Sequence, residues 1–179
     1  MRTALGFRAH SGWAALVAVA GTVGAPQILE RRRIIIGNTK QPYHAAAELP
    51  LFQAEELVQN AIESSRALAA EAISATVKAL RAHGHEVAGC GVVLGSGKPL
   101  PALEKILASH ALIHTAEGEL FRDVLVYAAE QCRLPVTGVR EKNLDARSLA
   151  RIGSLGRLIG PPWTQDQKYA TVAAFKALG

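Results

Sequence analysis

The chain has 179 residues, 49% of them hydrophobic, and a formal net charge of +5. This length suffices for a single domain, residues 1–179, with a sizeable core, and it is too short for two comfortable domains. The positive charge permits contact with nucleic acid or an anionic surface. It indicates neither, because much of it lies at scattered positions of predicted helices.

The amino-terminal segment and the cysteines bear on the cellular compartment. Residues 13–20 form an apolar run after two arginines, as in a secretory signal, but His10-Ser11-Gly12 interrupts the region where a signal needs apolar residues. The run is also shorter than the roughly 20 apolar residues of a membrane-spanning helix. Cys90 and Cys132 lie far apart in apolar surroundings, which favours buried free thiols. We therefore expect a cytoplasmic protein without a membrane segment.

The first 36 residues predict three strands in an antiparallel meander. Residues 2–7, 13–21 and 27–36 have strand character, and Ser11-Gly12 and Gly24-Ala25-Pro26 supply the turns. An apolar edge of this meander would allow a second copy to pair with it, so a homodimer is a reasonable expectation.

The third predicted strand contains Arg31-Arg32-Arg33, a run that suggests nucleic-acid binding. Side chains alternate along a strand, so the middle arginine points away from the other two and the basic patch is diluted. Aromatic residues make up only 5% of the chain, which leaves few platforms for stacking bases of a single strand.

A loop rich in turn-forming residues is expected at 37–50, followed by a long helix at 53–83 that ends before Gly84. Small and apolar residues recur along this helix at helical spacing. That stripe predicts close packing of the helix on a sheet.

The rest of the chain predicts buried strands that alternate with helices. Strands are expected at 87–94 and 135–139. Helices are expected at 101–109, 113–132, 145–158 and, capped by Thr164, from 165 to 178. Trp163 is expected to anchor the last helix against the core. The alternation predicts parallel strand connections and an α/β fold without a domain boundary.

Three stretches give this order of elements a resemblance to the ribonuclease H-like fold, and within it to Holliday-junction resolvases of the RuvC type. The opening Gly6-Phe7-Arg8 with its following Ser-Gly turn is similar to the start of those proteins. The helix at 117–132 that leads into Leu134-Pro135-Val136 resembles their long helix and next strand. The last helix, with Asp166 early and small residues after it, resembles their terminal helix. The resemblance implies a three-stranded antiparallel meander that continues into a mixed sheet with helices on both faces.

The sequence departs from that family in the residues that carry its activity. Nucleases of this fold hold two divalent metals with carboxylates from the first strand, the fourth strand and the last helix. Here the first position is Arg8, the strand segment Val92-Val93-Leu94 has no acid, and Asp166 alone is left. We therefore predict no two-metal nuclease activity and no cofactor. An arginine at the first position favours an anion, such as a phosphate or carboxylate.

Polar residues from three segments are candidates for a ligand site around Arg8. The candidates are Arg8, His10 and Ser11 at the first turn, His44 in the loop, and Asp166 and Lys168 in the last helix. The resemblance implies that the first strand and last helix are neighbours, which would bring Arg8 close to Asp166. A structural salt bridge and a ligand site both remain open interpretations. His10 alone suggests a turn residue that bonds the backbone.

A second candidate group lies near residue 114. His110, His114 and Glu117 would share one helix face, at the spacing by which two imidazoles and a carboxylate can ligate Zn²⁺. The alternatives are a helix cap with a polar loop, and a pocket shared with Arg8 or Arg122. Ala111 stands where a zinc-protease motif has glutamate, so no metal site is predicted and this set is only a weak candidate.

The loop Gly95-Ser96-Gly97-Lys98 follows a buried strand, where backbone amides can hold a phosphate. It lacks the spacing of known nucleotide-binding loops. A turn that exits the sheet is the simpler interpretation.

The sequence thus predicts a non-catalytic ribonuclease H-like module that binds nucleic acid or a small anionic ligand. The alternative is a hydrolase or transferase that uses His10, His114, Glu117 and Asp166 as acid, base or ligand. A nucleic-acid module needs cations gathered on one face, whereas an enzyme needs histidines and carboxylates that converge in a cleft.

Overall fold

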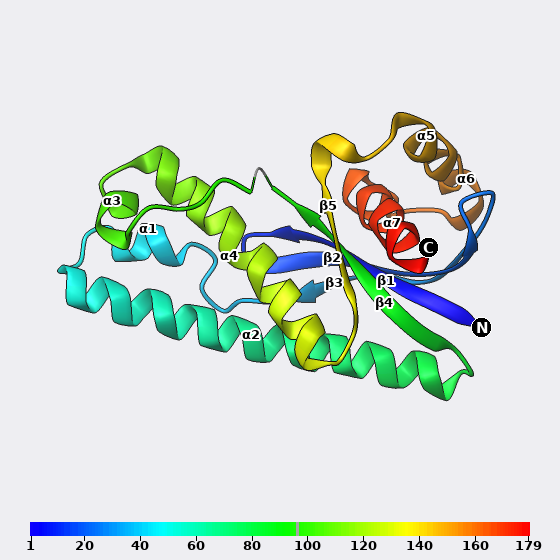
Figure 1. Ribbon diagram of the computed structural model, residues 1–179, viewed down its shortest axis with the longest axis horizontal. Coiled ribbons are helices and arrows are strands. Elements are labelled where there is room, and N and C mark those ends of the chain that lie inside the picture. Colours follow the sequence, from blue (N-terminus) through cyan, green and yellow to red (C-terminus); the bar gives the residue numbers. More distant parts are fainter. Residues whose placement is uncertain (96) are drawn as a thin grey trace.

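The computed structural model describes residues 1–95 and 97–179 and contains one mixed sheet of five strands in the order β3-β2-β1-β4-β5 (Figure 1). The first three strands pair antiparallel, and β4 and β5 run parallel to β1. The strands are β1 (Arg2–His10), β2 (Trp13–Thr22), β3 (Ala25–Ile35), β4 (Glu86–Leu94) and β5 (Val136–Arg140). The meander and its continuation into a mixed sheet are therefore confirmed.

Helices cover both faces of this sheet, as predicted. The long helices α2 and α4, with α1 and α3 at their ends, lie on one face, and α7 lies on the other with α5 and α6 beside it (Figure 1). The helices are α1 (Pro42–Ala46), α2 (Leu51–Ala82), α3 (Leu103–Leu107), α4 (His110–Gln131), the 3₁₀ turn η1 (Glu141–Asn143), α5 (Ala146–Ser154), α6 (Gly156–Ile159) and α7 (Gln165–Leu178).

Alternation along β1 divides the core into two layers. Leu5 and Phe7 are buried in the layer under α2 and α4, whereas Ala4 belongs to the layer under α7. Gly6 also faces α7, and a Cβ there would overlap the carbonyl oxygen of Ala170. The backbone of α7 therefore rests directly on the sheet.

Three expectations about the helices are wrong in detail. The stripe of small residues on α2 packs mainly against α4, with less contact to the sheet, and α7 makes the close approach instead. The loop at 37–50 contains the short helix α1, which begins at Pro42, a residue whose fixed φ suits a first helical position. The helix expected at 145–158 is divided into α5 and α6, with Asp145 capping the first of them.

The arginine run on β3 is split between the two faces, as its alternation predicts. Arg31 reaches the connection between α6 and α7 on one side. Arg32 points to the opposite layer, where it donates to Thr76 Oγ1 on α2 at 2.7 Å. Arg33 lies over the ring of Trp13, 3.7 Å from its centroid. The three side chains therefore form no common basic patch.

Replacing Arg31 with methionine is expected to lower the free energy of unfolding by roughly 1.5–3 kcal/mol, because a charged donor group would be lost from several carbonyls. Its guanidinium donates to the carbonyl oxygens of Ile159 at 2.6 Å, Gly160 at 2.7 Å and Pro162 at 2.9 Å. Urea unfolding measures the change. The matched control is Arg151→Met on the exposed side of α5, and equal stability of the two variants would show that the carbonyl contacts contribute nothing.

The edge of the meander is not the apolar edge expected from the sequence. The edge strand is β3, which carries Glu30 and the three arginines beside it. Charged side chains on an edge strand disfavour pairing with a second strand. Alternation buries Ile34 under α2 and leaves Ile35 exposed on the other face.

The cysteines are free, as expected, but only one is fully buried. Burial raises the pKa of Cys90 to about 12, so this thiol stays protonated, while Cys132 is half-buried. Trp163 anchors α7 as predicted, with its indole Nε1 donating to the carbonyl oxygen of Ile152 at 3.0 Å. Within the described part of the chain, every helix is too short or too polar to cross a membrane.

Candidate functional site

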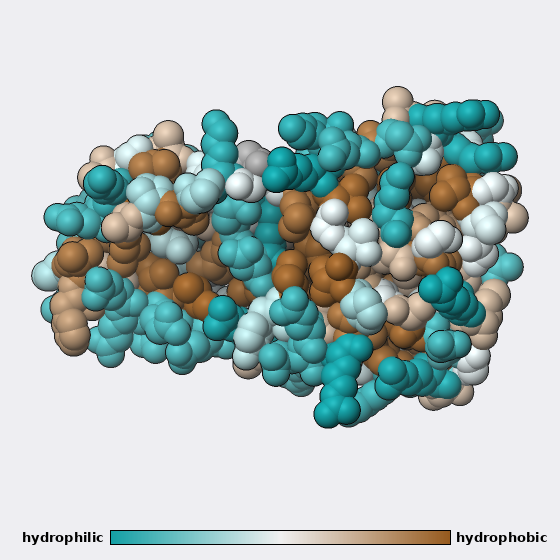
Figure 2. Space-filling view, in the orientation of Figure 1, coloured by the Kyte–Doolittle hydropathy of each residue, from teal (hydrophilic) through white to brown (hydrophobic). Residues whose placement is uncertain are grey.

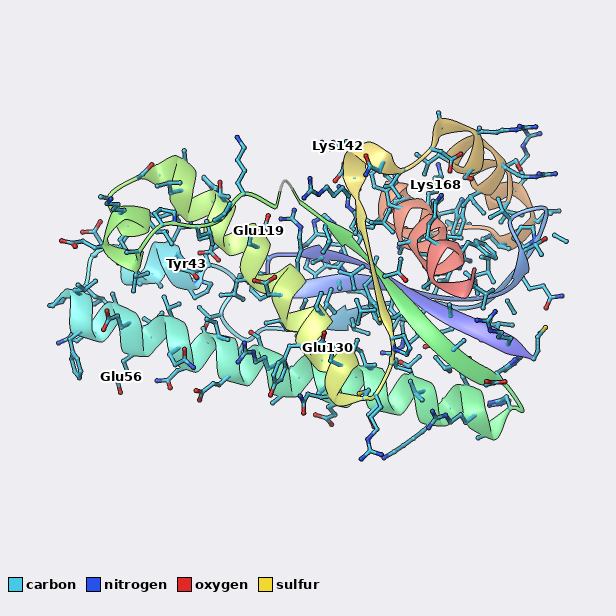
Figure 3. All side chains as sticks on the ribbon, viewed as in Figure 1. Tyr43, Glu56, Glu119, Glu130, Lys142 and Lys168 are labelled. Atoms are coloured by element: carbon cyan, nitrogen blue, oxygen red, sulfur yellow. The ribbon has the colours of Figure 1, made fainter. Side chains whose placement is uncertain are left out.

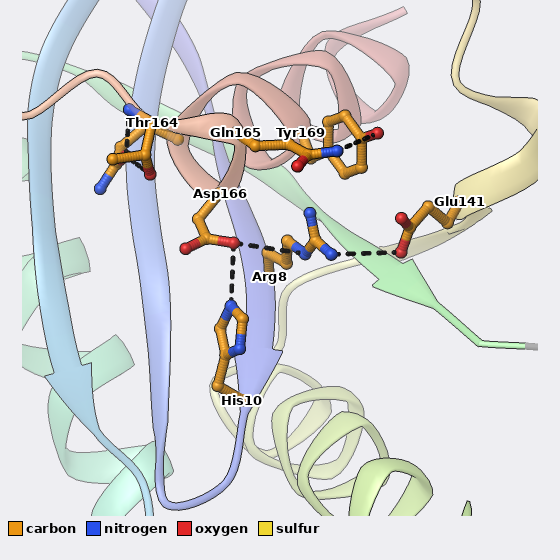
Figure 4. A network of polar contacts seen from close by, with 8 residues as sticks. Arg8, His10, Glu141, Thr164, Gln165, Asp166 and Tyr169 are labelled. Atoms are coloured by element: carbon orange, nitrogen blue, oxygen red, sulfur yellow. Dashed lines mark hydrogen bonds and ion pairs between the residues drawn. The ribbon is translucent and has the colours of Figure 1, made fainter.

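The carboxyl end of β1 and the amino end of α7 meet at one edge of the sheet. Arg8 and His10 are alternate residues of β1, so both face α7, and Asp166 lies in the first turn of α7 (Figure 4). The Nε2–H of His10 donates to Asp166 Oδ1 at 2.8 Å. Arg8 Nε lies 3.4 Å from the same oxygen. The Oδ1 atom of Asp166 thus contacts both basic side chains.

Glu141 completes this group from the other side. Its Oε2 lies 3.4 Å from Arg8 Nη2, so the guanidinium of Arg8 is held between two carboxylates (Figure 4). Glu141 follows β5 directly, and the side chains after β1 and β5 are brought together because both strands run parallel to β4. Sequence reasoning missed Glu141, although its position after a predicted parallel strand was an available signal.

Aromatic rings fix the two basic side chains in place. The guanidinium of Arg8 lies over the ring of Tyr169, 4.6 Å from its centroid, and the ring of His10 stacks on Trp13 at 4.3 Å. Arg8 and Asp166 expose only 19% and 23% of their side chains. The expectation that His10 is a turn residue bonded to the backbone is wrong, since it ends β1 and bonds Asp166.

The start of α7 is set by a capping box. Thr164 is the N-cap, its side chain accepts from the backbone of Gln167, and Gln167 accepts in return from the backbone N–H of Thr164 at 2.9 Å. This geometry fixes the first turn, and a carboxylate there is stabilised by the helix dipole. The position of Asp166 is therefore determined by the local sequence as well as by its partners.

A two-metal site of the nuclease type does not fit the residues present. Magnesium needs several carboxylate oxygens free to coordinate it. Here Asp166 and Glu141 both contact Arg8. Glu119 on α4 approaches the end of β4 beside Gly95, but its Oε1 bonds Arg122 Nη1 at 3.0 Å (Figure 3). Asp166, Glu141 and Glu119 therefore each contact an arginine side chain.

The remaining candidates near Arg8 are placed differently. Ser11 lies exposed in the turn between β1 and β2. Lys168 is half-buried on α7 and, in the described part of the chain, its amine has no hydrogen-bond or ion-pair partner (Figure 3). Arg122 pairs with Glu119, and no hydrogen bond or ion pair between described residues joins it to Arg8 or to the histidines.

A second group lies around the buried carboxylate of Glu117 on α4. Glu117 is 3% exposed, and its Oε1 accepts from the backbone N–H groups of Tyr43 at 2.9 Å and His44 at 3.2 Å. Burial raises the pKa of Glu117, and the contacts with His44 and Tyr43 oppose this effect. Burial also raises the pKa of Tyr43. Glu117 therefore ties α1 to α4.

The histidine set differs from the one the helical spacing suggests. His110 and His114 lie together at the start of α4, but their third neighbour is His44 of α1, with one ring nitrogen of each residue within 4.8 Å of the others. Glu117 lies behind His44, on the buried side of the helix. No hydrogen bond or ion pair among the described residues joins this group to Arg8 or Asp166. The enzyme hypothesis requires the histidines, Glu117 and Asp166 to converge in one cleft. These contacts do not bring them together.

The loop for which a phosphate site was the alternative to a simple turn includes Ser96, which lies outside the described residues. On either side of it, Gly95 abuts Glu119 and Arg122, and Gly97 has a positive φ of 67°. A Cβ at Gly97 would lie 3.0 Å from Nη2 of Arg140. The flanking glycines thus lie against arginine side chains.

A cationic groove runs along β5 at the same edge of the sheet. Its volume is about 600 Å³, and the side chains of Arg140, Lys142, Asn143 and Lys176 line it without a carboxylate. Figure 2 shows hydrophilic side chains over the end of β5 and the start of α7. This groove was not predicted, because Lys176 of α7 is far in the sequence from Arg140 and Lys142 and joins them only in the folded structure.

The comparisons with known proteins rest on structure alone. No protein-family model and no curated protein matches the chain. Two solved structures of RuvC from Thermus thermophilus do match it, each at 11% sequence identity. The first, RuvC in complex with a Holliday-junction substrate, has a TM-score of 0.56 over 98% of this chain and 91% of that one. The fold is ribonuclease H-like. The second match, RuvC without a stated ligand, has a TM-score of 0.53 over 97% of this chain and 90% of that one.

Proposed function

We propose that this chain is a single ribonuclease H-like domain that binds the phosphate backbone of nucleic acid without cleaving it. The observation that carries the proposal is the groove along β5, whose lining residues include Arg140, Lys142 and Lys176 and no carboxylate. Phosphate neutralised by lysine and arginine is the main source of sequence-independent affinity for nucleic acid. RuvC, which shares the fold, has been solved with a Holliday junction bound.

The position of the groove supports the proposal. It is formed by β5, the turn η1 that follows it and the carboxyl-terminal part of α7, which contribute Arg140, Lys142 and Lys176. All three lining cations of the groove are solvent-exposed and available to a ligand. The long side chains can follow a flexible polyanion, whereas the shallow groove offers little enclosure to a small ligand.

The absence of cleavage follows from the pairing of the carboxylates. Cleavage by two metals needs clustered carboxylates beside the phosphate. Asp166 and Glu141 are instead bridged by Arg8. Because the guanidinium of Arg8 contacts both carboxylates, neither is free to coordinate a divalent cation.

The test is fluorescence anisotropy of labelled duplex, single-stranded and four-way-junction DNA over a salt series. The variant Arg140→Ala/Lys142→Ala/Lys176→Ala is expected to bind at least 10-fold more weakly, and its slope of log Kd against log salt should be shallower by roughly 2–3. The matched control, Lys78→Ala/Arg81→Ala/Lys105→Ala, removes the same charge from exposed positions of α2 and α3 and should bind like the wild type.

Equal weakening of both triple variants would show that net charge, and not the groove, accounts for binding. No binding of any DNA at low salt would contradict the proposal and favour a small anionic ligand. Incubation with Mg²⁺ followed by gel analysis tests the second half of the proposal, because any cleavage that is lost in Asp166→Asn would overturn a non-catalytic role.

A further inference from the structure

Three imidazoles meet at the start of α4, away from the Arg8 site. His110 is the first residue of α4 and His114 lies one turn later on the same face, and their Nε2 atoms are 3.0 Å apart. His44 of α1 brings a third ring, 4.8 Å from that of His114 and 5.3 Å from that of His110 between centroids. One nitrogen of each ring lies within 4.8 Å of the other two.

The spacing of these nitrogens is close to that of a metal site. Ligand nitrogens about 2.0–2.1 Å from a tetrahedral Zn²⁺ are roughly 3.3 Å apart. The pair formed by His110 and His114 is already near that separation. His110 and His114 are exposed, so their side chains can rotate by the small amount needed to reach His44 without disturbing the core.

His44 is held in place by a buried carboxylate. Glu117 Oε1 accepts from the backbone N–H of His44 and lies 3.5 Å from its Nδ1. In the part of the chain that the structure describes, His44 Nε2 has no hydrogen-bond partner, so this nitrogen is available for a metal. A histidine whose other nitrogen faces a carboxylate is the common arrangement behind metal-bound imidazoles, because the carboxylate fixes the ring and raises its basicity.

We propose that His44, His110 and His114 bind a divalent transition metal ion, with Zn²⁺ as the preferred ion and Glu117 as a positioning residue. Imidazole nitrogens suit zinc and its neighbours, and they do not suit Mg²⁺ or Ca²⁺. Three protein ligands leave one coordination position open to solvent. Bound metal would clamp α1 to the first turn of α4.

The test is isothermal titration calorimetry with ZnCl₂ on the full chain, freed of any affinity tag and pretreated with EDTA. The wild type is expected to bind one zinc ion per chain. His110→Ala and His114→Ala are expected to bind at least 100-fold more weakly, and Glu117→Gln 10- to 100-fold more weakly with unchanged stoichiometry. Both histidines are exposed, so their variants should fold normally.

A second readout is the visible absorption spectrum of the protein titrated with Co²⁺, which reports tetrahedral nitrogen coordination. Bands that appear in the wild type and are absent from His114→Ala support the site. The matched control is His83→Ala, an exposed histidine at the end of α2, which should leave both readouts unchanged. Absence of saturable zinc binding, or affinity equal in His114→Ala and the wild type, would overturn the proposal.

Discussion

Replacing Gly91 with alanine is expected to lower the free energy of unfolding by about 3 kcal/mol. Gly91 lies in β4 under α7, and a Cβ there would overlap the carbonyl group of Ala173. Gly6 meets Ala170 in the same way on the neighbouring strand. The backbone of α7 therefore lies against both β1 and β4. A Cβ added on β4 would push the helix away from both strands. Urea unfolding at neutral pH measures the change.

The matched control is Gly153→Ala on α5, where a Cβ would meet nothing within 4 Å. This substitution is expected to be neutral or to stabilise by up to about 1 kcal/mol, because alanine favours a helix over glycine. Gly91→Ala should also weaken nucleic-acid binding, since a displaced α7 moves Lys176 away from Arg140 and Lys142 in the groove along β5. A wild-type unfolding midpoint for Gly91→Ala would mean that α7 does not approach the sheet this closely.

Replacing Glu117 with leucine is expected to lower the free energy of unfolding by roughly 2–4 kcal/mol relative to Glu117→Gln. Leucine leaves the backbone N–H groups of Tyr43 and His44 without an acceptor, whereas glutamine keeps an oxygen at the same place. Unfolding is measured in EDTA, so that no metal contributes. Equal stability of the two variants would show that this acceptor does not hold α1 against α4.

A comparison of the wild type with Glu117→Gln tests a pH dependence. Burial raises the folded-state pKa of Glu117 above its ordinary value of 4.5, so the folded chain binds this proton more tightly than the unfolded chain. The resulting contribution to stability is complete below about pH 4.5 and is lost as the pH rises through the folded-state pKa. Wild-type stability should therefore fall relative to Glu117→Gln as the pH is raised from about 4.5. A difference that is independent of pH would contradict the raised pKa.

Periodicity was sufficient to predict most of the fold. The strands of the meander, the buried strand β4 and the cap at Thr164 each follow from patterns within about ten residues. The helix α1 was missed because five residues are too few to show a period. The sequence predicted that α2 packs on the sheet, whereas it packs mainly on α4. A stripe of small residues indicates close packing but does not indicate which element packs against it.

The sites were less predictable, because their members come from distant segments. Alternation along β1 is enough to place Arg8 and His10 on one face. His44 was assigned from the sequence to the Arg8 site, whereas the structure places it beside His110 and His114. Glu141 joins Arg8 through the parallel pairing of β5. A sequence pattern on one helix found two of the three clustered histidines and took the supporting carboxylate for the third ligand.

The guanidinium between Asp166 and Glu141 acts as a permanent counter-ion. Two carboxylates near one another repel unless a cation separates them, and a dissolved ion can do so only when its concentration is high enough. Arg8 is attached to β1, so its presence costs no translational entropy and does not depend on ion supply. This edge of the sheet therefore keeps the same charge whether divalent ions are abundant or removed by a chelator.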